Sequence, residues 1–186
     1  CLRLVLVRSS RMADNYEQII FTNETYDLIA PKEKFIESLS GQFPDEKQAI
    51  RAYVALLHSQ VKSGRNFFVS KLLPNWLGPF LSGAMTKQFF KNGSKTTKEV
   101  LKQLTQNEKL IGVLTGQWGD YGLPPERSSF AMHAMVARHY LDGGNYPVGG
   151  ARMIAEYATD VIETLGGRIA VNGAVNEIMV KGNKDR

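Results

Sequence analysis

The sequence has 186 residues, 43% of them hydrophobic and 22% charged, values that exclude a wholly disordered chain and predict a packed core. Its 23 Lys and Arg residues outnumber 18 Asp and Glu residues, but they form no block typical of a nucleic-acid-binding arm, so nucleic acid is not expected as a partner. The single cysteine, Cys1, excludes an internal disulfide and a cysteine-rich metal site, as expected in a reducing compartment.

The amino-terminal part predicts β-structure. Residues 2–7 are apolar and β-prone, and residues 9–11 interrupt this run. Residues 17–22 and 25–29 are two strand candidates. Only Asn23-Glu24 separates them, which is the spacing of a two-residue hairpin.

Two prolines mark the starts of helices. Pro31 begins a helix that Gly41 ends, and Pro44 begins a longer helix with Gly64 just past its last turn. The longer helix is amphipathic, because its apolar residues recur at steps of three and four: Ile50, Tyr53, Val54, Leu57 and Val61.

Residues 72–90 are rich in leucine and aromatic residues and have lysines at both ends. Prolines and glycines interrupt the segment, no 18-residue run is apolar enough to predict a transmembrane helix, and no signal peptide is recognisable. Two interpretations stay open: the segment lies in a membrane interface as a peripheral contact, or it forms a pair of short helices that line an apolar cavity or cover a core.

The remainder of the chain predicts helices, a loop and two final strands. Thr96 and Glu99 have the spacing of a capping box, and Gly and Pro residues make 116–125 a loop. Helices are expected over 107–114, 128–141 and 151–165, and strands over 168–171 and 174–180, before an exposed turn over 181–186.

Catalytic signatures are missing from the sequence. It contains no GxGxxG, GxxxxGK[ST], HExxH or GxSxG motif. Among the three histidines, His133 and His139 lie six residues apart in an expected helix and therefore on different faces, so no shared metal ion is expected. A structural or surface role is the interpretation for each.

The segment Tyr146-Pro147-Val148-Gly149-Gly150 precedes an expected helix. Paired glycines leave the backbone bare, so that a flat or anionic ligand can approach exposed N–H groups; the alternative is ordinary helix-start chemistry.

Three groups of residues, in this order and spacing, resemble the central part of the phytoene desaturase, carotenoid isomerase and retinol saturase family. They are Tyr26–Phe35 with Phe43-Pro44-Asp45-Glu46, then Gly116–Pro125 (GQWGDYGLPP), then Ser129–Ala134 with Tyr146-Pro147-Val148-Gly149-Gly150 and Gly166-Gly167. The resemblance covers about residues 12–180. The GDYGLPP and YPxGG segments in combination are its specific part.

The resemblance implies a FAD-dependent oxidoreductase that transfers hydride between flavin and a conjugated polyene such as a carotenoid or retinoid. It implies an α+β chain: a helix-rich substrate-binding domain with a small mixed sheet over residues 1–142, and over 143–186 a helix–strand unit of an incomplete, Rossmann-like FAD-binding domain. Residues 146–150 would then contact the flavin, and a long apolar substrate would contact Trp118, Tyr121, Phe130 and His133. No residue is assigned as a catalytic acid or base, and no metal is expected.

Because the dinucleotide fingerprint is missing, the chain is expected to be a fragment with weak FAD affinity of its own. It is expected to be cytoplasmic or peripheral to a membrane. Two alternatives remain: a non-catalytic module that binds apolar ligands or membrane surfaces, and another oxidoreductase of the flavin amine-oxidase superfamily.

Overall fold

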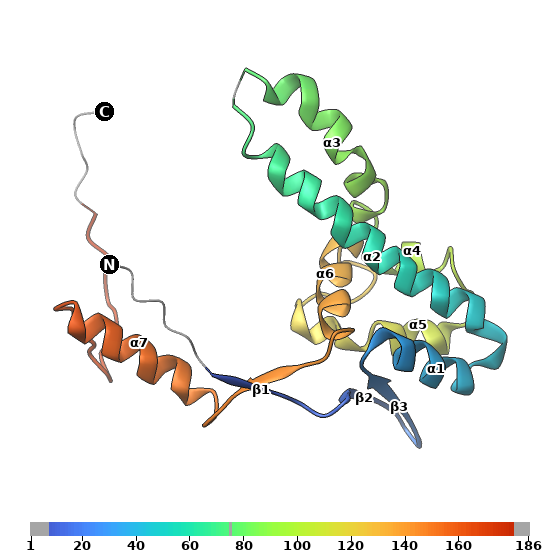
Figure 1. Ribbon diagram of the computed structural model, residues 1–186, viewed down its shortest axis with the longest axis horizontal. Helices are drawn as coiled ribbons and strands as arrows, with labels where there is room; N and C mark the ends of the chain where they lie inside the picture. Colours follow the sequence, from blue (N-terminus) through green and yellow to red (C-terminus); the bar gives the residue numbers. More distant parts are fainter. Residues whose placement is uncertain (1–7, 75, 181–186) are drawn as a thin grey trace. The chain divides into compact units, whose positions relative to one another are not determined.

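The computed structural model describes residues 8–74 and 76–180 (Figure 1). The chain divides into two units, which are named here the helical unit (residues 11–145) and the terminal unit (residues 1–10 and 146–186). The architecture is helix-rich α+β, as predicted, but in place of the expected mixed sheet the described residues form two separate two-stranded sheets.

The first sheet pairs β1 (Ser9–Arg11) with β4 (Asn145–Pro147), and the division between the units falls inside both strands. The prediction that residues 9–11 interrupt a strand is wrong. These residues are extended because β4 lies beside them, and hydrogen bonds flank the pair: Met12 N–H donates to Gly144 O at 3.0 Å, and Val148 N–H donates to Arg8 O at 2.8 Å. The strand expected over residues 2–7 and the turn expected over 181–186 lie outside the described residues.

The second sheet is the predicted hairpin. β2 (Asn15–Phe21) pairs antiparallel with β3 (Glu24–Ile29), and the connection is Thr22-Asn23, one residue earlier than expected. Thr22 has a φ of 51°, in the left-handed region that such tight turns require. Tyr26 and Leu28 of β3 point into the core.

Both proline-marked helices form, but they end later than predicted. α1 (Lys32–Gln42) continues through Gly41; after the short 3₁₀ helix η1 (Pro44–Glu46), α2 (Lys47–Ser70) continues through Gly64. Gly64 is buried, and a Cβ built there would lie 3.7 Å from the ring of Phe89. A glycine inside the helix therefore serves close packing against the next helix instead of ending α2.

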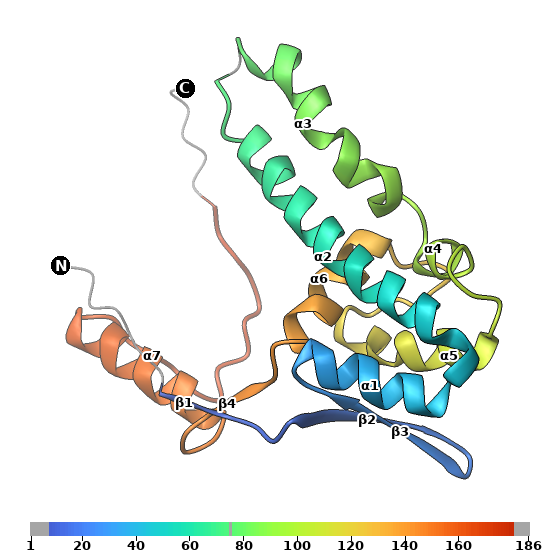
Figure 2. The same cartoon turned by 45° about the vertical axis from the view of Figure 1, so that its right-hand side comes forward.

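α3 (Gly78–Gly93) folds back on α2 to form the α2–α3 hairpin (Figure 2). The expected pair of short helices over 72–90 is wrong, because after the turn these residues belong to one helix. The rings of Phe67 and Phe89 stack with centroids 4.6 Å apart, and the Gln60 side chain donates to Phe89 O at 3.0 Å. At the end of α2 the Lys71 ammonium lies 5.1 Å from the centroid of the Phe67 ring.

Three further helices complete the helical unit: α4 (Thr97–Leu101), α5 (Glu108–Leu114) and α6 (Phe130–Tyr140). The predicted loop contains the short 3₁₀ helix η2 (Gly116–Asp120). α2 packs on α1 and on α6, so α2 runs through the centre of the unit (Figure 2). The largest fully buried apolar side chains come from most of these elements: Leu39, Ile50, Tyr53, Leu57, Leu101, Leu110, Phe130 and Leu141.

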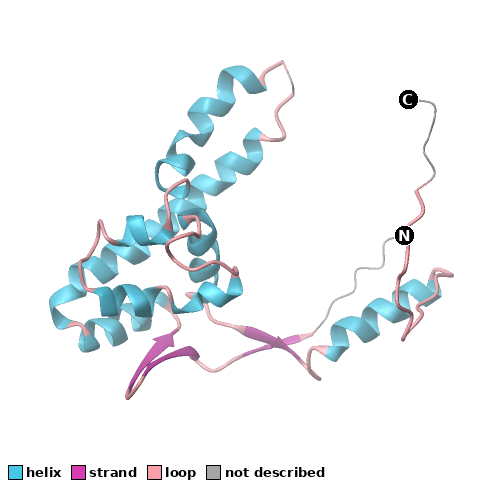
Figure 3. Ribbon diagram, turned by 180° about the vertical axis from the view of Figure 1, so that it is seen from behind, coloured by secondary structure: helices cyan, strands magenta, loops and turns pink. Residues whose placement is uncertain are grey.

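In the terminal unit, α7 (Arg152–Thr164) forms as predicted, but the strands expected over 168–171 and 174–180 do not (Figure 3). Their apolar side chains are exposed, Val175 and Ile178 among them. A strand needs a neighbour to satisfy its backbone groups, and no described residue pairs with this segment. None of the residues of α7 is buried within the described structure.

The capping box at the start of α4 is confirmed and gives a direct test of local stability. Glu99 N–H donates to Thr96 Oγ1 at 3.2 Å, and Thr96 N–H donates to Glu99 Oε2 at 2.8 Å, which holds the pKa of the Glu99 carboxyl below its usual value. We expect Thr96→Ala to lower the free energy of unfolding by about 1 kcal/mol in urea denaturation. Thr86→Ala, which removes only a bond to Ser82 O within α3, is the matched control; an equal loss in both variants would contradict a capping role.

Candidate functional site

Three of the four predicted site residues in the helical unit, Tyr121, Phe130 and His133, meet at one buried imidazole. His133 of α6 is 1% exposed and lies between two tyrosines. Its Nε2 is 2.9 Å from the Tyr53 hydroxyl of α2, and its Nδ1 is 3.0 Å from the Tyr121 hydroxyl, in the loop after η2. The Tyr53 hydroxyl also donates to Leu114 O at 3.4 Å.

These contacts define a consistent hydrogen-bond order. When Tyr53 donates to the carbonyl of Leu114, it accepts from Nε2–H of His133, and Nδ1 then accepts from the Tyr121 hydroxyl. Every polar atom of the set is satisfied by a neutral imidazole. Burial lowers the pKa of His133 to about 4, which keeps the ring neutral at pH 7.

Tyr121 connects this buried set to the surface. Burial raises the pKa of its phenol to about 12, so the hydroxyl stays protonated and available as a donor. Gly122 follows with a φ of 81°, a conformation that glycine adopts without strain and that turns the chain toward Pro124. The buried His133 is therefore hydrogen-bonded to a residue, Tyr121, that is itself partly exposed to solvent.

The outer face of α6 carries a second set of residues. A surface groove of about 340 Å³ is lined by apolar side chains with polar groups among them: Met132, Met135, Val136, Tyr140, His139 and Asp120. Met132 and Met135 are nearly half exposed, and Trp118 of η2 is 46% exposed. Methionine side chains adapt to irregular apolar ligands, so this groove suits an apolar molecule.

Three of the four predicted substrate residues lie together, since the ring centroids of Phe130 and His133 are also only 5.8 Å apart. Tyr121 and His133 are in contact, Trp118 lies at the surface, and Phe130 is fully buried in the core. Sequence reasoning missed the groove on α6. The spacing of Met132, Met135, Val136 and His139 at i, i+3, i+4 and i+7 is the signal that could have found it.

The predicted flavin-contacting segment lies in the terminal unit. Tyr146 and Val148 are about half exposed, and Gly149 and Gly150 both have φ values near 90°. A Cβ built at Gly150 would meet nothing within 4 Å, whereas one at Gly149 would lie 2.9 Å from the flexible Met153 side chain. The backbone at Gly150 is therefore open to a flat ring, which fits a flavin.

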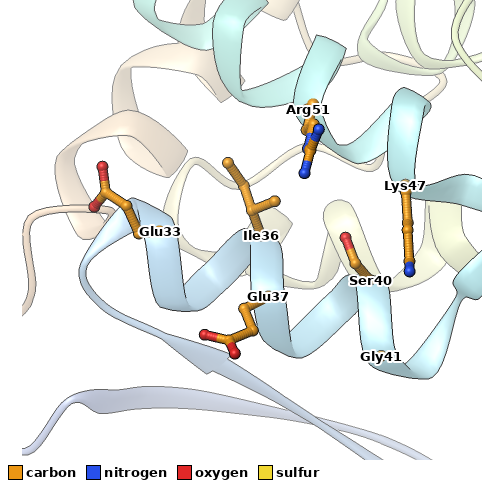
Figure 4. Close-up of a pocket in the computed structure, with 7 residues that line it drawn as sticks. All are labelled: Glu33, Ile36, Glu37, Ser40, Gly41, Lys47 and Arg51. Atoms are coloured by element: carbon orange, nitrogen blue, oxygen red, sulfur yellow. The ribbon is translucent and has the colours of Figure 1, made fainter.

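A further pocket among the described residues lies elsewhere, between α1 and the start of α2 (Figure 4). Its volume is about 520 Å³, and its lining combines acidic, basic and neutral side chains: Glu33, Ile36, Glu37, Ser40, Gly41, Lys47 and Arg51. In Figure 4, Arg51 and Lys47 extend from α2 toward α1. Two cations and two carboxylates in one open pocket do not suit an apolar ligand.

Within residues 8–74 and 76–180, no group of three or more His, Cys, Asp or Glu side chains is arranged to hold a metal ion. Over the same residues, no helix combines the length and apolarity needed to cross a bilayer.

The fold and the groove define an α+β chain with a surface suited to an apolar ligand. No protein-family model and no solved structure matches it. All-trans-retinol 13,14-reductase from Danio rerio is 32% identical over 164 residues, which is 86% of this chain and 27% of that protein. The Homo sapiens protein of the same name is 30% identical over 159 residues, 83% of this chain and 26% of that protein. A Danio rerio protein named inactive all-trans-retinol 13,14-reductase is 28% identical over 159 residues.

The chain spans about a quarter of the length of these relatives. Over that part it is homologous to the all-trans-retinol 13,14-reductases, and the predicted family resemblance is confirmed.

The buried imidazole predicts a specific dependence of stability on pH. The unfolded chain binds a proton at His133 with a pKa near 6.5, whereas the folded chain binds it only near 4. The free energy of unfolding therefore falls as the pH drops from about 6.5 toward 4, by roughly 3 kcal/mol from this residue.

We expect His133→Gln to lose this component, so that its urea-unfolding free energy changes less than that of the wild type between pH 7 and pH 4. His139→Gln, at an exposed position of the same helix, is the control and should keep the wild-type pH profile. Parallel profiles for all three proteins would refute the assignment.

Proposed function

We propose that this chain is the substrate-binding part of a FAD-dependent oxidoreductase that acts by hydride transfer on a conjugated polyene of the carotenoid or retinoid type. The observation that carries the proposal is the similarity to proteins named all-trans-retinol 13,14-reductase over 83–86% of the chain. The methionine-lined groove on α6 supports it, because a polyene is long, apolar and able to lie on such a surface.

In this proposal the groove residues bind and orient the substrate. Met132, Met135 and Val136 supply apolar contact along one face of α6, and Tyr140 supplies an aromatic ring. Asp120 and His139 give the groove polar groups that suit a hydroxyl or carbonyl end of the substrate. The contact between Tyr121 and His133 holds the end of η2, which carries Asp120, against α6.

Tyr146, Pro147, Val148, Gly149 and Gly150 would hold the flavin ring, since the exposed backbone at Gly150 fits a flat ligand. When bound, FAD supplies the hydride chemistry at its N5 atom. This sequence contains no GxGxxG motif, so residues beyond those of this chain would hold the ADP half. Pro147 and Val148 contribute to positioning and to excluding water.

Two qualifications of the activity follow from the relatives. One similar protein is named inactive, so likeness over this segment is compatible with both catalytic and non-catalytic members. The names do not favour an amine oxidoreductase or a purely non-catalytic binding module.

Peripheral membrane contact through residues 72–90 remains part of the proposal, because the substrates are poorly soluble in water.

The groove can be tested with all-trans-retinol. In a Trp76→Phe background, Trp118 is the sole tryptophan, and retinol bound in the groove should quench its emission by energy transfer. We expect Met135→Glu to weaken this binding at least tenfold, because a carboxylate would be buried against an apolar ligand.

Leu72→Glu is the matched control, since it places the same charge on an exposed apolar position outside the groove. Retinol affinity that is unchanged by Met135→Glu, or lowered as much by Leu72→Glu, would argue against a substrate site on α6.

A further inference from the structure

The acidic residues of the chain are distributed unevenly. From Lys47 to Lys98 the sequence has nine Lys or Arg residues and no Asp or Glu, whereas the remaining residues include 14 Lys or Arg and 18 Asp or Glu. This acid-free segment covers α2 and α3, which form the α2–α3 hairpin. The positive net charge of the protein is therefore due to this part of the fold.

The same hairpin ends in an exposed apolar tip. Leu72 is 83%, Trp76 73% and Phe80 80% exposed, while the Phe67, Phe89 and Phe90 rings pack together between the two helices. The side chains at the turn therefore remain uncovered by the described residues although an aromatic cluster lies directly behind them. Large apolar groups exposed together at the end of a helical hairpin are typical of an interaction surface.

The cations lie at a defined distance from this tip. Arg65 of α2 lies six residues before Lys71, and Lys87 of α3 lies nine residues after Gly78, so they are about 9 Å and about 14 Å from the turn at 1.5 Å per residue. All of Lys62, Arg65, Lys71, Lys87 and Lys91 are exposed. Interfacial elements enter a bilayer by roughly 5–10 Å, which would bring these cations to the level of lipid phosphates.

We propose that the α2–α3 hairpin binds bilayers that carry anionic lipid, with its apolar tip among the acyl chains and its cations on the headgroups. This deepens the membrane contact in the proposed function and rests on it. Nucleic acid or an acidic protein surface would complement the cations but would leave Trp76 and Phe80 without an apolar partner. A bilayer with negative headgroups complements both features of the hairpin.

The test compares vesicles of phosphatidylcholine alone with vesicles that also contain 30% phosphatidylserine. Binding of the purified chain is measured by flotation and, in a Trp118→Phe background, by the blue shift of Trp76 emission. We expect at least tenfold tighter binding to the anionic vesicles at 0.1 M salt, and a loss of this preference at 0.5 M salt, because salt screens the attraction.

Two double variants show which cations are responsible for the preference for anionic vesicles. Arg65→Gln with Lys87→Gln should remove most of the preference for anionic vesicles. Lys47→Gln with Arg51→Gln removes two cations from the far end of the same helix, about 30 to 36 Å from the tip, and should keep the preference. Both variants change only exposed residues, and circular dichroism checks that each is folded.

Equal binding to the two vesicle types, or equal loss in both double variants, would overturn the headgroup assignment while leaving the membrane contact in place. Absence of binding to either vesicle would overturn the membrane contact as well. Neither result bears on retinol binding at α6, which is measured separately.

Discussion

The helical unit depends on how one imidazole is satisfied away from water. His133 carries a donor and an acceptor into the interior, and an unsatisfied buried polar atom costs about 1–3 kcal/mol. Tyr53 and Tyr121 remove this cost, and in doing so they connect α2, α6 and the loop after η2. The loop after η2 is therefore attached to α6 at Tyr121, in addition to its backbone hydrogen bonds. The groove on the outer face of α6 depends on the same contact, because Asp120, which lines the groove, precedes Tyr121 in the chain.

The fold was predictable where the signal was local. The capping box of Thr96 and Glu99 and the β2–β3 hairpin each depend on residues within a few positions of one another. The predictions were wrong where contacts between residues far apart in the sequence determine the local structure. Gly64 has the features of a helix terminus in sequence, but Phe89 lies against it from another helix. Residues 168–180 alternate like strands but have no paired neighbour among the described residues.

The candidate site shows the same limit. Sequence reasoning selected Tyr121 and His133, and the structure places them in contact. The sequence could not show that Phe130 would be buried while Met132 and Met135 would be exposed. α6 has apolar residues on both its inner and outer faces, so periodicity alone does not tell which face packs against α2. Whether Tyr146–Gly150 contacts a flavin stays a prediction, and the open backbone at Gly150 is the property that makes it reasonable.

The contact between Lys71 and Phe67 has a consequence for the end of α2. An ammonium group that leaves water loses strong hydration, and this loss opposes its transfer to any less polar environment. The face of the Phe67 ring, 5.1 Å from the Lys71 nitrogen, replaces part of that hydration within the protein itself. Lys71 is therefore prepared for partial dehydration before any partner arrives, and it is the cation nearest to Leu72 in the sequence.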